Sequence, residues 1–139
     1  MKVFPSRITP DSITKLAGNE IFVFGSNLAG RHGLGAAKTA MKWGAIYGQG
    51  FGPQGQTFGI PTMNSVITSK LSLPSISGYV KSFIEYAKHL PSFRFLVTEI
   101  GCGLAGWTPD DIAPLFKDAI DIPNITLPKN FWIVLQDLT

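Results

Sequence analysis

The feature that most constrains the fold is a pair of glycine-rich segments, each placed after an apolar run and before a helix-competent stretch. The first covers residues 25–37 and follows the apolar run 21–24. The second covers residues 101–107 and follows the apolar run 93–100. In open α/β sheets, ligands bind beyond the carboxyl ends of the strands. The two segments are therefore expected to face each other across a crevice at one sheet edge.

The other elements alternate between strands and helices. Further strands are expected at 57–61, where Pro61 ends the strand, and at 131–135, while 48–55 is expected to be loop. Helices are expected at 9–16, 36–43, 79–90 and from Thr108 to about Ala119, with Ser75 or Ser77 as the cap of the third. The alternation predicts a three-layer α/β sandwich, and a chain of 139 residues fits one domain, 1–139.

Charge and cysteine content narrow the classes of function. The net charge of +3 is scattered, without runs of Lys or Arg, which argues against direct nucleic-acid binding but suits an anionic small ligand. The single cysteine, Cys102, excludes an internal disulfide. Residues 1–5 lack the apolar core of a signal peptide, and no apolar stretch approaches membrane-spanning length. We therefore expect a cytoplasmic protein without a membrane partner.

Glycine has a physical reason to occur in such loops. Without a Cβ, backbone N–H groups can turn inward and cradle phosphate oxygens. Gly33, Gly35 and Ala36 are placed for this in the first loop, and Gly101, Gly103 and Gly106 in the second. The first loop lacks both the Gly-Lys-Ser/Thr ending of a Walker loop and the third glycine of a dinucleotide fingerprint. The alternative is that these glycines only make tight turns.

Three blocks carry a resemblance to a known family. They are Gly-Ser-Asn-x-x-Gly-x-His-Gly-x-Gly-Ala-Ala at 25–37, Gly-Gln-Thr-Phe-Gly-Ile-Pro-Thr at 55–62, and Thr-Glu-Ile-Gly-Cys-Gly-Leu-Ala-Gly at 98–106. The chain resembles the macrodomain superfamily of ADP-ribose binders, and more closely a group of small phage and bacterial macro-like proteins. The third block is similar to one in terminal ADP-ribose glycohydrolases and DNA ADP-ribosyl glycohydrolase antitoxins. The resemblance implies a mixed, mostly parallel six-stranded sheet between helices.

The resemblance also implies a ligand, which is ADP-ribose or a related NAD-derived nucleotide. Asn27 matches an asparagine that orients the distal ribose, and Asp11 is the suggested counterpart of an acid that binds adenine. The lysine and aspartate of the similar glycohydrolases are replaced here by Met63 and Ala105. The expected ligand-binding residues are Gly25, Ser26, Asn27, Gly33, Leu34, Gly35, Ala36, Thr62, Gly101, Cys102, Gly103, Leu104, Ala105, Gly106 and Trp107.

Four residues could take part in catalysis, each with a structural alternative. Asn27 could position a water or a ribose hydroxyl, or bond its own chain. His32 could act as an acid or base, or as a structural hydrogen-bonding group. Asp110 could activate water, or match the dipole of the helix it begins. Cys102 could be a thiolate nucleophile or a small packing residue. No cofactor and no metal site are expected.

Three functions follow from these alternatives. The first is hydrolysis of an ADP-ribose conjugate, which includes an ADP-ribosylated macromolecule, by a water held near Asn27. The second is a reader or sponge that binds an NAD-derived signal without chemistry, which the absent lysine and aspartate favour. The third is a structural or interaction protein that keeps only the fold.

Overall fold

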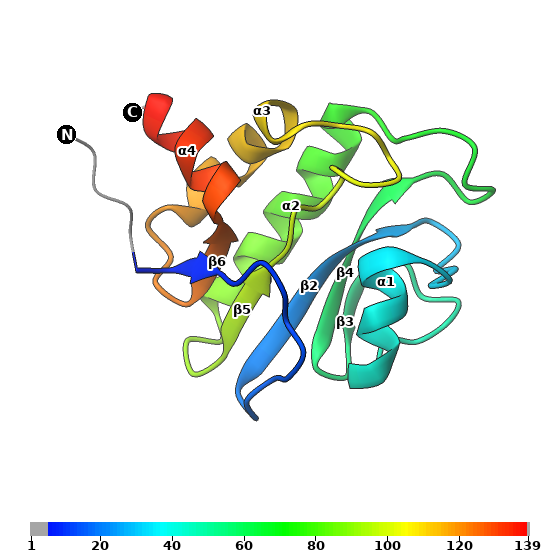
Figure 1. The fold of residues 1–139 in the computed structure, drawn as a ribbon, viewed down its shortest axis with the longest axis horizontal. Helices are drawn as coiled ribbons and strands as arrows, with labels where there is room; N and C mark the ends of the chain where they lie inside the picture. Colours follow the sequence, from blue (N-terminus) through cyan, green and yellow to red (C-terminus); the bar gives the residue numbers. More distant parts are fainter. Residues whose placement is uncertain (1–5, 139) are drawn as a thin grey trace.

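The computed structural model describes residues 6–138, so the expectation for residues 1–5 lies outside the described residues. Its centre is a six-stranded sheet in the order β1-β6-β5-β2-β4-β3 (Figure 1). Only β3 and β4 pair antiparallel, and the other neighbours are parallel. The expectation of a mixed, mostly parallel α/β sheet is therefore confirmed. The strands are β1 (Ile8–Thr9), β2 (Glu20–Asn27), β3 (Gly52–Gln54), β4 (Thr57–Met63), β5 (Arg94–Val97) and β6 (Ile125–Pro128).

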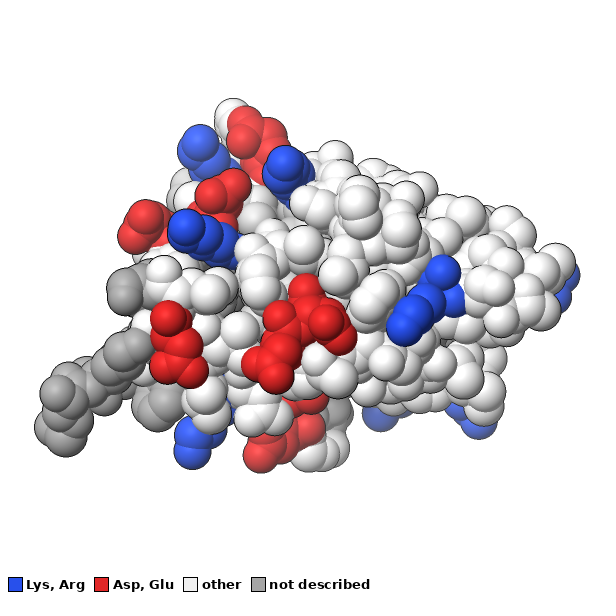
Figure 2. Space-filling view, turned by 90° about the horizontal axis from the view of Figure 1, so that it is seen from above, with Lys and Arg blue, Asp and Glu red and all other residues white. Residues whose placement is uncertain are grey.

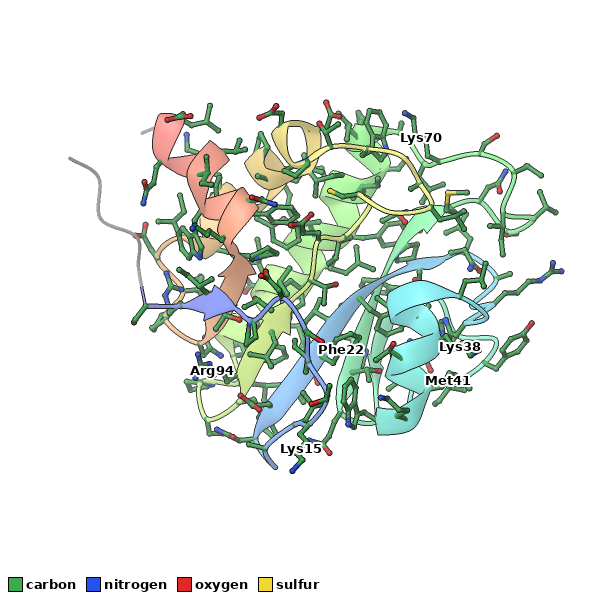
Figure 3. All side chains as sticks on the ribbon, in the orientation of Figure 1. Lys15, Phe22, Lys38, Met41, Lys70 and Arg94 are labelled. Atoms are coloured by element: carbon green, nitrogen blue, oxygen red, sulfur yellow. The ribbon has the colours of Figure 1, made fainter. Side chains whose placement is uncertain are left out.

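The alternation of side chains along β2 separates two apolar layers. Phe22 and Phe24 point to one face, where they pack against Ala37 and Ala40 of helix α1 (Gly35–Ala40). Phe22 is labelled in Figure 3 beside this part of the sheet. A 3-10 turn, η1 (Met41–Trp43), continues α1 until Gly44 ends it with a φ of 101°. This smaller layer positions the start of α1 over the carboxyl end of β2.

The larger layer covers the opposite face of the sheet, where Val23 of β2 points. It holds α2 (Leu73–Lys88), α3 (Pro109–Ile112), the 3-10 helix η2 (Ala113–Ala119) and α4 (Lys129–Asp137). Helix α2 is amphipathic and buries Ile76, Val80, Phe83, Ile84 and Ala87. The Phe83 ring lies 5.1 Å from that of Phe58 and 5.6 Å from that of Phe95. The two layers with the sheet between them are consistent with a three-layer sandwich.

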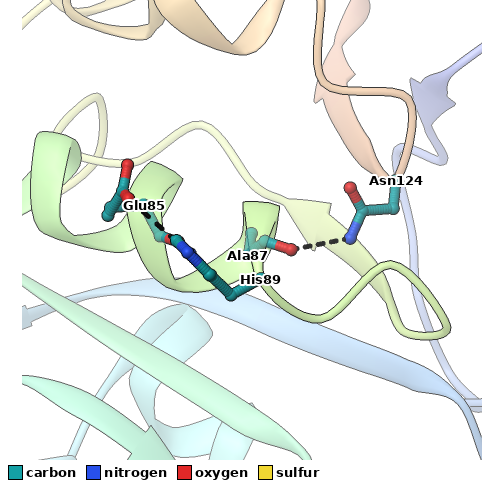
Figure 4. A network of polar contacts seen from close by, with 4 residues as sticks. All are labelled: Glu85, Ala87, His89 and Asn124. Carbon is teal, nitrogen blue, oxygen red and sulfur yellow. Dashed lines mark hydrogen bonds and ion pairs between the residues drawn. The ribbon is translucent and has the colours of Figure 1, made fainter.

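A polar contact fixes the carboxyl end of α2. Asn124 Nδ2 donates to the carbonyl oxygen of Ala87 at 2.9 Å (Figure 4). The same Nδ2 also donates to the carbonyl oxygen of Leu90 at 3.0 Å. On the exposed side of the same turn, His89 Nδ1 lies 2.8 Å from the Glu85 carbonyl oxygen and 3.6 Å from Glu85 Oε1 (Figure 4). Asn124 precedes β6, so its amide joins the last turn of α2 to the sheet. Figure 3 labels Arg94, the first residue of β5, at this amino end of the strands.

Two expected elements are wrong in type. Residues 131–135 lie in helix α4, and the last strand is the preceding β6. An apolar run of five residues suits a buried helix as well as a strand, and Pro128 ends the strand where the helix begins. Residues 9–16 do not form a helix, because Ile8 and Thr9 pair with β6 and the chain then crosses the smaller layer without helical structure. Ile13 and Leu16 pack there.

Three expected boundaries also change. β4 continues past Pro61 to Met63. Proline has no N–H to donate to a neighbouring strand, but the β2–β4 register shifts beside it, between Ser26 and Asn27, so the sheet tolerates the missing hydrogen bond. Part of the expected 48–55 loop forms the edge strand β3. Ser72 rather than Ser75 or Ser77 caps α2, because its side chain accepts from the Ser75 N–H.

Candidate functional site

A cavity of about 320 Å³ lies between the two glycine loops, at the carboxyl ends of β2, β4 and β5. The crevice expected from the sequence therefore exists at this edge of the sheet. The expected ligand-binding residues that line it are Gly25, Ser26, Asn27, Gly33, Leu34, Gly35, Ala36, Thr62, Gly101, Gly103, Leu104 and Ala105. Cys102, Gly106 and Trp107 are not among its described lining residues, and neither are His32 and Asp110.

Asn27 lines the cavity, but its amide is engaged with its own chain. Nδ2 donates to the Arg31 carbonyl at 3.0 Å, and Oδ1 accepts the Arg31 N–H at 2.9 Å. These two bonds shape the loop between β2 and α1 and fix the backbone of Arg31. Asn27 therefore has a structural role in the loop, and its contact with a ribose stays a prediction. One amide hydrogen of Nδ2 remains for a further partner.

His32 supports the first loop from beneath. Its side chain is 3% exposed, and Nε2 lies 2.9 Å from the Gln49 carbonyl and 3.3 Å from Gln54 Oε1. The ring meets Phe24 edge-on at 5.2 Å. Nδ1 is buried and has no hydrogen-bond partner. Because the side chain is enclosed behind the loop, these contacts match the structural alternative for His32.

A third glycine segment, residues 48–52, packs against the first loop. The Gly48 N–H donates to the Gly30 carbonyl at 2.9 Å, and the Ser26 hydroxyl donates to the Gly50 carbonyl. A Cβ on Gly50 would collide with the Asn27 carbonyl oxygen, and one on Gly30 with the backbone of Gln49. These glycines serve the fold itself. Sequence reasoning missed this support, because nothing local in 48–52 indicates which backbone it approaches.

Gly33 and Gly103 differ from those glycines. A Cβ at either position would meet no atom within 4 Å, and neither φ lies in the left-handed region. Gly35, Gly101 and Gly106, by contrast, have φ values of 59°, 77° and 81°, which favour glycine. Gly33 and Gly103 both line the cavity, one from each loop. Neither the backbone nor a neighbouring residue of the chain requires glycine at these two places.

The second loop is held by residues that point away from the cavity. Trp107 Nε1 donates to the Leu71 carbonyl at 3.2 Å, and Lys70 Nζ lies 3.7 Å from the centre of its ring. The Cys102 thiol donates to the Ile100 carbonyl at 3.5 Å. Burial, together with the nearby Glu99 and Asp111, raises the pKa of Cys102 to about 12. The thiol is therefore protonated at neutral pH, which argues against a nucleophilic thiolate.

Asp110 and Asp111 begin α3, as expected from their position after Thr108 and Pro109. Asp111 Oδ2 accepts from the Thr108 N–H at 3.1 Å and from its hydroxyl at 2.9 Å, and these bonds lower the pKa of Asp111. Asp110 is exposed in the same turn. Asp111 thus completes a capping box with Thr108, and Asp110 lies in the first turn, where an acid interacts favourably with the helix dipole. Both positions match the structural alternative to catalysis.

Charge is sparse in the cavity. Among its described lining residues, only Arg31 and Glu99 carry a formal charge. Met63 and Ala105 both line it, and neither side chain can act as a nucleophile or an acid. In Figure 2, acidic and basic side chains are mixed at the left, acidic ones gather near the centre, and at the right only cations interrupt the uncharged surface.

A second cavity of about 390 Å³ adjoins the first, since Ala36, Thr98 and Glu99 line both. The second cavity also contacts Asp11 and Phe22, on the side of the sheet that α1 covers. Sequence reasoning suggested Asp11 but missed Glu99 and Arg31, because a single charge in a loop gives no signal of its own. We use the term cleft for the two cavities together with this shared wall; the second cavity has an acidic lining, and the first contains Arg31 as well as Glu99.

Comparisons with family models, curated proteins and solved structures find no match for this chain. Within residues 6–138, no helix is long and apolar enough to cross a membrane. In the same part of the chain, no group of three or more His, Cys, Asp or Glu side chains could hold a metal ion. Any assignment of function therefore depends on the cleft itself.

Proposed function

We propose that the cleft binds ADP-ribose or a related NAD-derived nucleotide with a diphosphate. The observation that carries this proposal is the pair Gly33 and Gly103, whose missing side chains leave open space at the cavity wall. Glycine loses more conformational entropy on folding than other residues do, so a glycine that the fold does not require favours close approach of another molecule. A diphosphate cradled by backbone N–H groups needs such an approach.

The first cavity has the donors that a diphosphate requires. No side chain caps the start of α1, so the N–H groups of its first turn remain available to oxygen atoms of a ligand. Arg31 adds a cation at the same wall. The α3 start differs, because Thr108 and Asp111 already satisfy it. Donors for phosphate therefore concentrate at the first loop, with the second loop closing the opposite side.

The second cavity suits the adenosine end of such a ligand. Its volume of about 390 Å³ and that of the first, about 320 Å³, both lie in the usual range for small-molecule sites, roughly 300–1,000 Å³. Asp11 offers an acceptor for an exocyclic amine, as the resemblance suggests, and Phe22 offers an apolar surface. A nucleotide with a diphosphate between two sugars would then span the cleft.

Binding without turnover is the function that these contacts support best. Met63 and Ala105 provide no nucleophile and no acid, and both Asn27 and His32 are engaged with the protein's own backbone. Asp110 does not line the cavity. We therefore favour a reader or sponge over a hydrolase of ADP-ribose conjugates. The proposal includes membership of the macrodomain superfamily. It is supported by the resemblance of the three sequence blocks and by a sheet that is compatible with that fold.

Alanine variants of the two open glycines test the proposal. Gly33→Ala and Gly103→Ala should fold with unchanged unfolding temperatures, because the added methyl group meets no atom of the chain. In thermal-shift titrations, each should weaken ADP-ribose binding by about tenfold or more, since overpacking typically costs roughly 1–3 kcal/mol.

Gly78→Ala is the matched control. Gly78 also has open space at its Cβ, but it lies on α2, away from the cleft. This variant should keep full affinity and gain up to about 1 kcal/mol of stability from helix propensity. Normal affinity in both cleft variants would contradict the proposal. Release of ADP-ribose from a labelled protein or DNA conjugate by the native protein would instead select the hydrolase.

A further inference from the structure

We propose that Glu99 selects nucleotides whose adenosine ribose carries a free 2′-hydroxyl, so that a 2′-phosphate is rejected. This inference rests on the proposed function and names the substrate class of the same cleft. The observation behind it is the position of one carboxylate between two cavities of different charge. Glu99, Thr98 and Ala36 are the residues that line both.

The charges of the two cavities orient a nucleotide in the cleft. Arg31 is the one cationic residue among the described lining of the first cavity. The described lining of the second contains Asp11 and Glu99 and no Lys or Arg. Glu99 lines both cavities, but Arg31 balances it in the first, while Asp11 adds to it in the second. A phosphate group is therefore repelled less in the first cavity, which leaves the second for an uncharged base. The sugar that joins base and phosphate then lies at the boundary, beside Glu99.

The Glu99 side chain is exposed and has a hydrogen-bond partner on α4. Asn130, at the start of α4, donates through Nδ2 to Glu99 Oε2 at 2.9 Å. A carboxylate has two oxygens with several acceptor positions, so Glu99 can also accept a hydroxyl of the sugar while it keeps the bond to Asn130. A carboxylate accepts hydrogen bonds from a ribose diol, and such charge-assisted bonds are stronger than neutral ones. The same carboxylate repels a phosphate ester at that carbon, as acidic residues do in NAD-selective dehydrogenases.

The contrast between two ligands tests this role. Calorimetry would compare ADP-ribose with ADP-ribose 2′-phosphate on the native protein and on Glu99→Gln. The native protein should prefer ADP-ribose by about tenfold or more. The isosteric amide removes the charge, so the 2′-phosphate should bind more tightly and the preference should shrink at least about fivefold. Asn130→Ala releases the carboxylate and should reduce the preference partially, with an unchanged unfolding temperature.

Glu85→Gln is the matched control, because Glu85 lies on the exposed side of α2 outside both cavities. It should keep the native preference. Equal affinities of the native protein for the two ligands would overturn the inference while the proposed function stands, and so would an unchanged preference in Glu99→Gln. If neither ligand binds the native protein, the proposed function and this inference both fail.

Discussion

At the scale of single residues, Ile67 is the clearest point of strain in the described chain. It has a φ of 57° although it is β-branched, and it lines the first cavity. Asn64 fixes the turn, since its carbonyl accepts the Ile67 N–H at 3.2 Å and its side chain accepts the Thr68 N–H at 3.0 Å. Such strain costs about 1–2 kcal/mol and persists mainly at functional positions. We infer that Ile67 is kept for its apolar contact in the cavity.

Replacing Ile67 separates stability from binding. Ile67→Asn relieves the strain, because asparagine tolerates the left-handed region, and should raise the free energy of unfolding by about 0.5–1 kcal/mol in urea titrations. The same variant should weaken ADP-ribose binding by about threefold to tenfold, since an apolar contact is lost. Val66→Asn, at the exposed neighbouring position, should change neither quantity. A loss of stability without a loss of affinity in Ile67→Asn would refute this interpretation.

At the scale of elements, the two-residue strand β1 depends on Arg7. The Arg7 guanidinium donates to the carbonyl oxygens of Ile122, Ile120 and, at 2.9 Å, Ile125. Trp132 Nε1 in turn donates to the Arg7 carbonyl at 2.8 Å. These contacts join β1 to the end of η2 and to α4. They also position the segment after β1, from which Asp11 reaches the second cavity.

Arg7→Lys should destabilise the protein. A lysine keeps the charge but lacks the planar set of donors, so several carbonyl groups lose their partner. We expect a decrease of about 1.5–3 kcal/mol in the free energy of unfolding, measured by urea denaturation. Arg94→Lys, at the exposed first position of β5, should stay within about 0.5 kcal/mol of the native value. Equal stability of the two variants would show that β1 does not need Arg7.

Element types were predictable where periodicity was unambiguous. The apolar stripe of α2 and the strand–loop–helix order around both glycine loops agree with the structure. The run 131–135 was ambiguous, since a short apolar run fits either a strand or a buried helix. Only tertiary packing of Phe131, Trp132 and Leu135 against the larger layer decides for the helix. β1 was missed because pairing with β6 overrides the helix-start signals of Pro10 and Thr9.

At the scale of the whole molecule, the place of the cleft was predictable and its chemistry was not. Parallel strands bring their carboxyl ends to one edge, so two loops after β2 and β5 had to meet. The support of the first loop by residues 48–52, and the position of Glu99 between the cavities, arise from long-range contacts. Sequence reasoning also assigned candidate catalytic roles to His32 and Asp110, which the fold places outside the lining of the first cavity.

The central claim is that one nucleotide diphosphate occupies this cleft. Isothermal titration calorimetry of the native protein with ADP-ribose tests it most directly. The account predicts saturable binding of one ADP-ribose per chain, competition by nucleotides with a diphosphate, and loss of the heat in the Gly33→Ala/Gly103→Ala double variant. No heat at several temperatures, together with no thermal shift at millimolar ADP-ribose in a folded sample, would contradict it.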